Sequence, residues 1–445
     1  MEDSTRPLEG LTVVELSIAI AAPSCGRMLA YFGAEVIRLE SQQHPDVVRL
    51  IGSAWARTPE LAPVFTDTSP YLAEMNANKH SVGLNLKAPA ALTAAKRLIA
   101  TADIFLTNYS TPAVTDLGLG EATLRAEFPG LIYVSLPAFG SDPAMPYYEY
   151  ISWGPNQAPL VGLDELSGFP DQEPAGVASF AAPDYFAGLH AFTAVLTALE
   201  HRDRTGLGSA VDLSQFEVTV SALGPLLLDQ QLSGTVATRS GNRVTWYAPQ
   251  GVYPCRGEDR WVAISVKDDA QWTALVGLLG DADLTGDLDL ADLADLAGRH
   301  RHHDRLDEAI SAWTKGRSAE EAATRLQHAG VAAYPTNDTE AMLVDPQLRE
   351  YGWYQTRPTL RFPQGDLFGG CAMHLSDTPG RWDRAAPSAG EHTIAALSER
   401  AGLTQTEINA LLEAGVAFTP PTPAVVLKRP YDHVLGPLGL RKVGS

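Results

Sequence analysis

The chain has 445 residues, 45% of them hydrophobic and 19% charged, which is typical of a soluble globular protein large enough for two domains. Its formal net charge of −20 disfavours nucleic acids and anionic membranes as partners, but not a small anionic ligand beside a local basic patch. The three cysteines are far apart and lack CxxC spacing, which favours a reducing compartment. The sequence has neither a secretory leader at its polar N-terminus nor an apolar run that could span a bilayer, so we expect a cytoplasmic protein.

The first 140 residues alternate short apolar strands with helical patterns. Strand patterns occur at residues 11–17, 35–40, 81–86, 103–108 and 131–139, and helical patterns between them at 23–34, 88–102 and 121–130. Repeated strand–helix–strand units predict an α/β fold with a doubly wound, Rossmann-like parallel sheet. The first strand–helix turn, SIAIAAPSCG, lacks the GxGxxG fingerprint, which argues against a dinucleotide oxidoreductase.

The pattern changes in the middle of the chain. Residues 209–232 predict a strand followed by a single helix. The segment QGVYPCRGEDRWVAISV (250–266) then predicts a β-hairpin with RGED as its turn, and polar helices follow it. We therefore expect a second, smaller α+β domain over residues 225–330.

Asp184 is the first candidate for chemistry, because it stands between a proline and an apolar run with no other acidic residue as far as Leu199. A Pro–Asp pair at a helix start predicts a cap, in which the carboxylate accepts the free N–H groups of the first turn. A carboxylate stabilised by a helix N-terminus can also be the nucleophile of an acyl transfer. The two interpretations are compatible.

Two further clusters favour structural roles. The stretch GRHRHHDR (298–305) has no HxxxH or HExxH spacing and carries many charged neighbours, so it predicts a solvated helix start rather than a metal site. Glu391 and His392 are adjacent, and adjacent residues on a helix point to different faces, so a helix N-terminus is favoured over an acid–base pair. We expect no metal site.

Five segments, taken together, resemble the class III CoA-transferase family, which includes formyl-CoA transferases, carnitine CoA-transferases and α-methylacyl-CoA racemases. They are PLEGLTVVELSIAIAAPSCGRMLAYFGAEVIRLE (7–40), NANKHSVGLNLK (76–87), ADIFLTNYS (102–110), the Asp184 helix with RTGLG (204–208) and SDTPGRWDRAAPSAGEHT (376–393). Their order and spacing match the family from about residue 7 to residue 415. The resemblance implies a large Rossmann-like domain built from residues 1–224 and 331–445, a small domain at 225–330, and an interlocked homodimer.

The resemblance also implies an activity, because Asp184 falls on the family's catalytic aspartate. In the transferases this residue attacks an acyl-CoA thioester and forms a mixed anhydride, and the returning CoA thiolate gives an aspartyl-CoA thioester. An incoming carboxylic acid then collects the CoA. The expected substrates are thus an acyl-CoA and a free carboxylic acid, with coenzyme A entering as part of the substrate.

The family's contacts to CoA carry over onto eight positions of this sequence, namely Ile20, Ala21, Arg38, Leu84, Lys87, Asn108, Tyr109 and Trp153. Two departures weaken the match, since Ser110 and Asp116 replace arginines that face CoA in the family. An acidic side chain beside a polyanion is unfavourable. Arg49 and Lys79 are candidates for compensating cations.

Two alternatives remain open at this stage. The racemases of the family pair the aspartate with an upstream histidine, but here Trp153 stands near that position and no histidine lies between His80 and His190, which disfavours a racemase. A CoA-binding paralogue without turnover is the other alternative, and the charge reversal at Asp116 supports it. The apolar residues Ile20, Trp153 and Phe186 suggest an acyl group larger or less polar than formate or oxalate.

Overall fold

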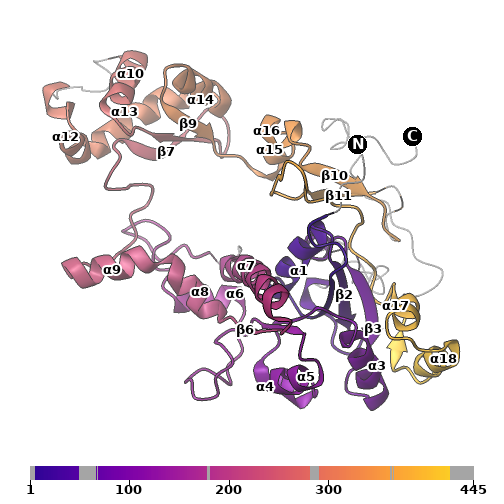
Figure 1. The fold of residues 1–445 in the computed structure, drawn as a ribbon. Coiled ribbons are helices and arrows are strands. Elements are labelled where there is room, and N and C mark those ends of the chain that lie inside the picture. The colour runs from indigo at the N-terminus through magenta and orange to yellow at the C-terminus, as the bar shows by residue number, and fades with distance from the viewer. Residues whose placement is uncertain are drawn as a thin grey trace. The chain divides into compact units, whose positions relative to one another are not determined.

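The computed structural model describes residues 6–49, 67, 69–177, 181–280, 290–360, 363 and 365–420 (Figure 1). By their internal contacts these residues form two compact units. The first unit draws its residues from Met1–Leu163, Val177–Thr235 and Leu343–Ser445. The second draws its residues from Asp164–Gly176 and Val236–Met342. The first unit is therefore assembled from both ends of the chain.

A seven-stranded sheet forms the centre of the first unit, in the order β12-β3-β2-β1-β4-β5-β6. Six strands pair in parallel, and only β12 pairs antiparallel, with β3. The predicted α/β class, the parallel sheet and the first five strands are confirmed. The strands are β1 (Thr12–Leu16), β2 (Glu35–Glu40), β3 (His80–Leu84), β4 (Ile104–Thr107), β5 (Ile132–Ser135), β6 (Ala210–Asp212) and β12 (Ala417–Phe418).

Both faces of this sheet are covered by helices, because its central strands are apolar on both sides. Val14 and Phe105 point into one core, which packs against α3 (Pro89–Ile99), α17 (Thr393–Glu399) and α18 (Gln405–Glu413). Val13 and Leu106 point into the other, which packs against α1 (Ala21–Tyr31) and α7 (Ala182–Thr205). Figure 1 shows α1 and α7 side by side on one face.

The remaining elements of the first unit are short helices and one hairpin. The single helix predicted within residues 209–232 is wrong: α8 ends at Ala222 and α9 begins at Gly224. Pro225 explains the break, because a proline fits the first turn of a helix but not its interior. The elements are α2 (Pro70–Met75), α4 (Thr111–Asp116), α5 (Glu121–Glu127), α6 (Gly154–Leu160), α8 (Gln215–Ala222), α9 (Gly224–Ser233), α16 (Pro346–Glu350), β10 (Tyr354–Arg357) and β11 (Asp366–Gly369), with α15 (Thr339–Leu343) at the junction of the units.

The second unit is a three-stranded antiparallel sheet packed against helices, and the predicted hairpin is confirmed as β7 (Gln250–Pro254) and β8 (Trp261–Ser265). The predicted solvation of residues 298–305 is wrong for Arg299 and His303, which are each 2% exposed. The ring Nε2 of His303 lies 3.1 Å from the backbone N of Gln250. This histidine begins a helix that packs on β7, so it faces the core. The other elements are β9 (Ala332–Pro335), α10 (Asp269–Leu279), α12 (Leu296–Arg301), α13 (His303–Lys315) and α14 (Ala319–His328).

Candidate active site

Two cavities lie at the carboxyl ends of the parallel strands, the edge where open α/β sheets bind their ligands. They share His44, Tyr109 and Ala113. The larger cavity, of 650 Å³, is lined by Leu16, Leu39, Glu40, Ser41, His44, Leu84, Asn85, Leu86, Lys87, Pro89, Leu92, Tyr109, Ala113, Asp116 and Leu117. The Asp184 cavity, of 370 Å³, is lined by Ile18, Ala19, His44, Pro45, Val47, Asn108, Tyr109, Ser110, Ala113, Pro137, Ala138, Phe139, Gly140, Tyr148, Tyr150, Ile151, Ser152, Trp153, Asp184 and Gln215.

Asp184 lies in the first turn of α7 and is 6% exposed. The prediction that it caps this helix is wrong, because the N-cap is Ala181 and Asp184 is the third helical residue. Pro183 accounts for the difference: it lacks an N–H group and fits the first turn, so the helix begins before it. The carboxylate is therefore not the N-cap of α7, although it accepts the N–H of its own residue in the first turn.

Burial raises the pKa of Asp184 to about 6, while the backbone N–H groups of Asp184, Gly154 and Ala21 oppose the rise. Gly154 and Ala21 are the first residues of α6 and α1, so the N-termini of three helices meet at one carboxylate. Among the described residues no lysine or arginine forms an ion pair with Asp184. Oriented N–H dipoles, without a counter-charge, therefore stabilise this anion.

Two glycines allow this close approach. A Cβ at Gly154 would lie 1.9 Å from Oδ2 of Asp184, so any larger residue would displace either α6 or the carboxylate. A Cβ at Gly188, one turn further along α7, would lie 1.9 Å from Oγ of Ser24 on α1. Both positions therefore require glycine for the three helix ends to meet.

The turn between β1 and α1 is fixed by hydrogen bonds from two neighbouring strands. Oδ1 of Asn108, after β4, accepts from the Ile18 N–H at 2.9 Å, and its Nδ2 donates to the Ile18 carbonyl at 2.8 Å. The next residue, Ala19, has a positive φ of 57° and donates its N–H to Oδ1 of Asp46 at 2.9 Å. These bonds hold a strained turn, and the turn determines where the N–H of Ala21 points.

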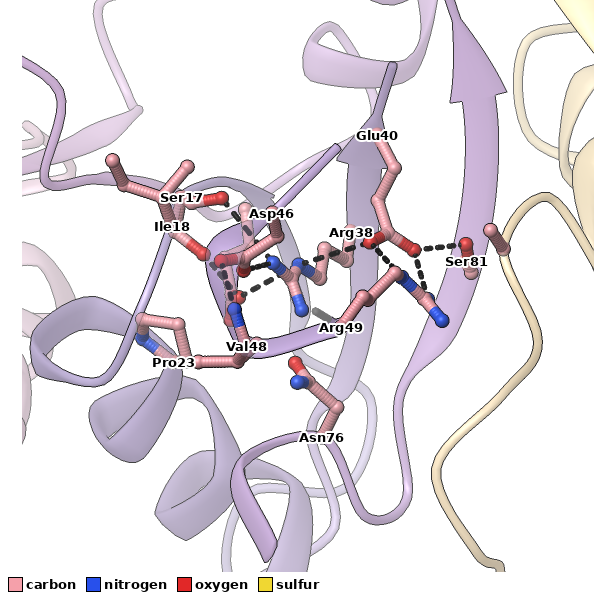
Figure 2. Close-up of polar contacts among 12 residues, drawn as sticks. Ser17, Ile18, Pro23, Arg38, Glu40, Asp46, Val48, Arg49, Asn76 and Ser81 are labelled. Carbon is pink, nitrogen blue, oxygen red and sulfur yellow. Dashed lines mark hydrogen bonds and ion pairs between the residues drawn. The ribbon is translucent and has the colours of Figure 1, made fainter. Parts of the chain in front are cut away.

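A network of buried ion pairs holds Asp46, which accepts the N–H of Ala19 in this turn (Figure 2). Arg38, on β2 and 1% exposed, forms an ion pair with Asp46, and its Nε lies 3.8 Å from Glu15 and from Glu40. We call this set of side chains, completed by the pairs Arg49–Glu40 at 2.6 Å and Lys79–Glu15 at 2.9 Å, the Arg38 network. Its members are buried and bind one another.

The structure brings most of the predicted site residues together. Asp184, Asn108, Tyr109 and Trp153 line the Asp184 cavity, while Leu84, Lys87 and again Tyr109 line the larger one.

The described walls of both cavities do not include Ile20, Ala21 or Arg38, although Ala21 reaches Asp184 through its backbone. Arg49 and Lys79, considered as compensating cations, are likewise absent from these walls and are held by Glu40 and Glu15.

Sequence reasoning missed several residues of the Asp184 cavity, because they lie in loops or at a helix start without a motif. These are His44 after β2, Phe139 after β5, Gln215 at the start of α8, and the segment that contains Tyr148, Tyr150 and Ile151. The rule that ligands bind at the carboxyl ends of parallel strands points to His44 and Phe139. It gives no indication of Tyr150, which follows no strand.

The sequence profile of CoA-transferase family III matches residues 8–393. The chain belongs to this family and is a CoA-transferase. Within the described part of the chain, no helix is long and apolar enough to cross a membrane, and no group of three or more His, Cys, Asp or Glu residues could hold a metal ion.

Two curated CoA-transferases and one crystal structure are similar to this chain over most of its length. The succinyl-CoA–D-citramalate CoA-transferase of Chloroflexus aurantiacus is 29% identical over 92% of this chain and 97% of its own length. The succinate–glutarate CoA-transferase of Agrobacterium fabrum is 30% identical over 91% of this chain and 98% of its own. The crystal structure of a CaiB/BaiF family protein from Brucella suis matches with a TM-score of 0.77 and 28% identity, over 89% of this chain and 99% of that one.

Proposed function

We propose that this CoA-transferase works through a covalent intermediate on Asp184. The observation that carries the proposal is a buried carboxylate at a cavity wall, held by the N-termini of three helices and without a counter-ion among the described residues. An ion pair would hold the charge of the carboxylate in place, whereas N–H groups leave one oxygen lone pair available for attack. With a pKa near 6, the group is an anion at neutral pH.

The reaction proceeds in four balanced steps. An oxygen of Asp184 attacks the thioester carbon, the C–S bond breaks, and CoA thiolate leaves a mixed anhydride behind. The thiolate attacks the aspartyl carbon, which releases the donor acid and forms an aspartyl-CoA thioester. The acceptor carboxylate attacks this thioester and again gives an anhydride and free thiolate. Attack of the thiolate on the acceptor's acyl carbon yields the new acyl-CoA and restores Asp184.

The N–H groups of Gly154 and Ala21 serve the second and third steps as well. When Asp184 is acylated, it loses its charge and presents a carbonyl oxygen where the carboxylate oxygen lay. Attack on the aspartyl carbon then builds negative charge on this oxygen, beside donors that are already oriented. The same donors thus hold the nucleophile and stabilise the tetrahedral state that follows.

The two cavities, which share three lining residues, give CoA a path across the sheet edge. We place the nucleotide end in the larger cavity, near Leu84 and Lys87, and the thioester in the Asp184 cavity beside Trp153, with Tyr109 at the junction. Lys87 is exposed and supplies a positive charge there, while Asp116 opposes it from the same cavity. Arg38 contributes indirectly, by holding Asp46 and the turn that leads to Ala21.

We also propose that two copies of the chain assemble into an interlocked homodimer. Helix α9 supports this, because none of its residues is buried although it carries four leucines, of which Leu228 is 59% and Leu232 87% exposed. An apolar helix face of this kind is stable in water only when another surface covers it. Light scattering should give the mass of a dimer, and Leu228→Glu should weaken it, whereas a monomeric wild type would contradict the assignment.

The reaction is tested by one incubation in D₂O with a panel of free acids and a panel of acyl-CoAs, which includes phenylacetyl-CoA and succinyl-CoA, a donor in the name of a relative. Mass spectrometry should find CoA on a new acid without deuterium at the α-carbon. Deuterium at that carbon without CoA exchange would support the racemase alternative. Absence of CoA exchange with every acid would overturn the transferase proposal.

A further inference from the structure

The side chains that line the Asp184 cavity indicate which kind of acyl group the cavity can hold. Besides Tyr109 at the junction of the two cavities, four aromatic side chains lie in this wall, from Phe139, Tyr148, Tyr150 and Trp153, together with Ile151. Tyr150, Ile151 and Trp153 are 61%, 78% and 42% exposed. Large apolar groups gathered around one cavity and left open to solvent are typical of a site that a ligand covers.

These aromatic residues support one another. The rings of Phe139 and Tyr147 meet edge to face with centroids 5.2 Å apart, and Tyr147 stacks on Tyr150 at 5.5 Å. Phe139 also contacts Phe216 of α8, with ring centroids 5.9 Å apart. Tyr150 is therefore held by a continuous row of rings that begins at the sheet edge, which preorganises it for contact with a flat apolar group.

Among its described residues the same wall offers a second carboxylate His44 and uncharged polar groups, but no permanently charged partner. Its described residues include no lysine or arginine, and the only acidic group is Asp184 itself. The nearby cations Arg38 and Arg49 are buried within the Arg38 network and held by Asp46 and Glu40. A dicarboxylic acyl group would lose the hydration of its distal charge in this cavity without gaining an ion pair to a lysine or arginine of the described wall.

We infer that the acyl group carried by this transferase is an apolar, aromatic monocarboxylic acid rather than a dicarboxylic one. This inference rests on the proposed function, because it takes the Asp184 cavity as the acyl site. It separates the protein from the two relatives described above, whose names specify succinate, glutarate and citramalate. Tyr150 and Trp153 act as specificity-determining residues, and the single carboxyl group of the acid reacts at Asp184.

The first test compares two thioesters that differ only in the acyl group, phenylacetyl-CoA and succinyl-CoA. Their dissociation constants are measured by calorimetry on the full-length Asp184→Asn variant, which does not consume them. Phenylacetyl-CoA should bind about tenfold more tightly. Tyr150→Ala should reduce this ratio at least about threefold, whereas Tyr334→Ala, which removes an equally exposed tyrosine outside the cavity, should leave it unchanged. Equal or tighter binding of succinyl-CoA would overturn the inference.

A second test separates failure of the inference from failure of the proposed function. The wild-type enzyme receives phenylacetyl-CoA with equal concentrations of 3-phenylpropanoate and glutarate, and each new acyl-CoA is quantified. CoA should pass mainly to 3-phenylpropanoate. Faster transfer to glutarate would overturn the inference and leave the transferase mechanism intact. No transfer to either acid, together with tight binding of phenylacetyl-CoA, would overturn the mechanism and retain the aromatic acyl site.

Discussion

Two buried aspartates at the same edge of the sheet differ in whether a cationic side chain binds them. Asp46 is 5% exposed and Asp184 is 6% exposed, and both accept backbone N–H groups. Asp46 also binds the guanidinium of Arg38, whereas Asp184 has no cationic partner among the described residues. The two carboxylates are equally buried and differ in whether a cation pairs with them. The paired carboxylate supports the fold, and the unpaired one is the candidate for chemistry.

The two regions are also connected. Asp46 accepts the N–H of Ala19, and the turn at Ala19 leads directly into the first residue of α1, whose N–H faces Asp184. The Arg38 network therefore positions one of the donors on which the candidate nucleophile depends. Substitutions in the Arg38 network should mainly lower the stability of the fold, and should lower activity only by moving the N–H of Ala21. Substitutions at Asp184 should mainly lower activity.

The largest effect is expected from Asp184→Asn, which keeps the shape of the side chain and removes its nucleophilic oxygen. The rate constant kcat for CoA transfer should fall at least about 10³-fold, because the covalent route is lost. Asp203→Asn serves as a control, since it makes the same change at an exposed position in the last turns of the same helix, and it should keep wild-type activity. Comparable activity of the two variants would refute the assigned role.

Arg38→Met should produce the largest loss of stability. It leaves Asp46, Glu15 and Glu40 buried without one of their cations, and the free energy of unfolding should fall by about 3–5 kcal/mol. Arg97→Met removes a cation that is 46% exposed and lies 3.7 Å from Glu407, so its cost should stay below about 1 kcal/mol. Urea denaturation of the two variants measures the difference, and a similar loss in both would show that the Arg38 network adds no special stability.

The raised pKa of Asp184 predicts that the same Asp184→Asn substitution increases the stability of the fold by an amount that depends on pH. Burial raises the folded-state pKa to about 6, above the ordinary 3.8, so ionisation of this group destabilises the native state at neutral pH. Asp184→Asn should therefore raise the free energy of unfolding by up to about 3 kcal/mol near pH 8. The gain should shrink as the pH falls through about 6 and vanish below about 4. A gain that is independent of pH between these limits would contradict the assigned pKa.

The smallest effects on catalysis are expected from charged residues of the larger cavity, because solvent screens their charges. Lys87→Ala should raise the KM for acyl-CoA about threefold with little change in kcat, and Asp116→Ala should lower it by a similar factor. Both effects should weaken with rising salt concentration. Measurements of kcat and KM at two ionic strengths are sufficient, and a change confined to kcat would place these residues outside the CoA site.

The sequence predicted the fold well where one local pattern determines the structure. The strands from Thr12 to Ser135 are apolar runs bounded by helical patterns, and parallel pairing follows from that alternation. The break between α8 and α9 was predictable from Pro225 but was overlooked. The order of strands, and the return of β12 to the edge of the sheet, depend on contacts between distant segments that no local pattern encodes.

The candidate site was predictable only in part. Asp184 stands out in sequence as a lone acid before an apolar run, and Asn108 and Lys87 follow predicted strands. Arg38 lies in the second half of a predicted strand, and nothing in its local sequence shows that Asp46 would neutralise it. Tyr150 lies in an irregular segment, so its place in the cavity depends on the row of rings that only the folded chain creates.

The most direct test of the central claim is to quench the enzyme in acid during turnover and measure its intact mass, followed by peptide mapping. The wild-type enzyme should carry an adduct equal to one CoA less one water on the peptide that contains Asp184, because the intermediate is a thioester of that side chain. The adduct should be absent from Asp184→Asn. Rapid CoA transfer with Asp184 unmodified throughout, or an adduct on another residue, would contradict the account.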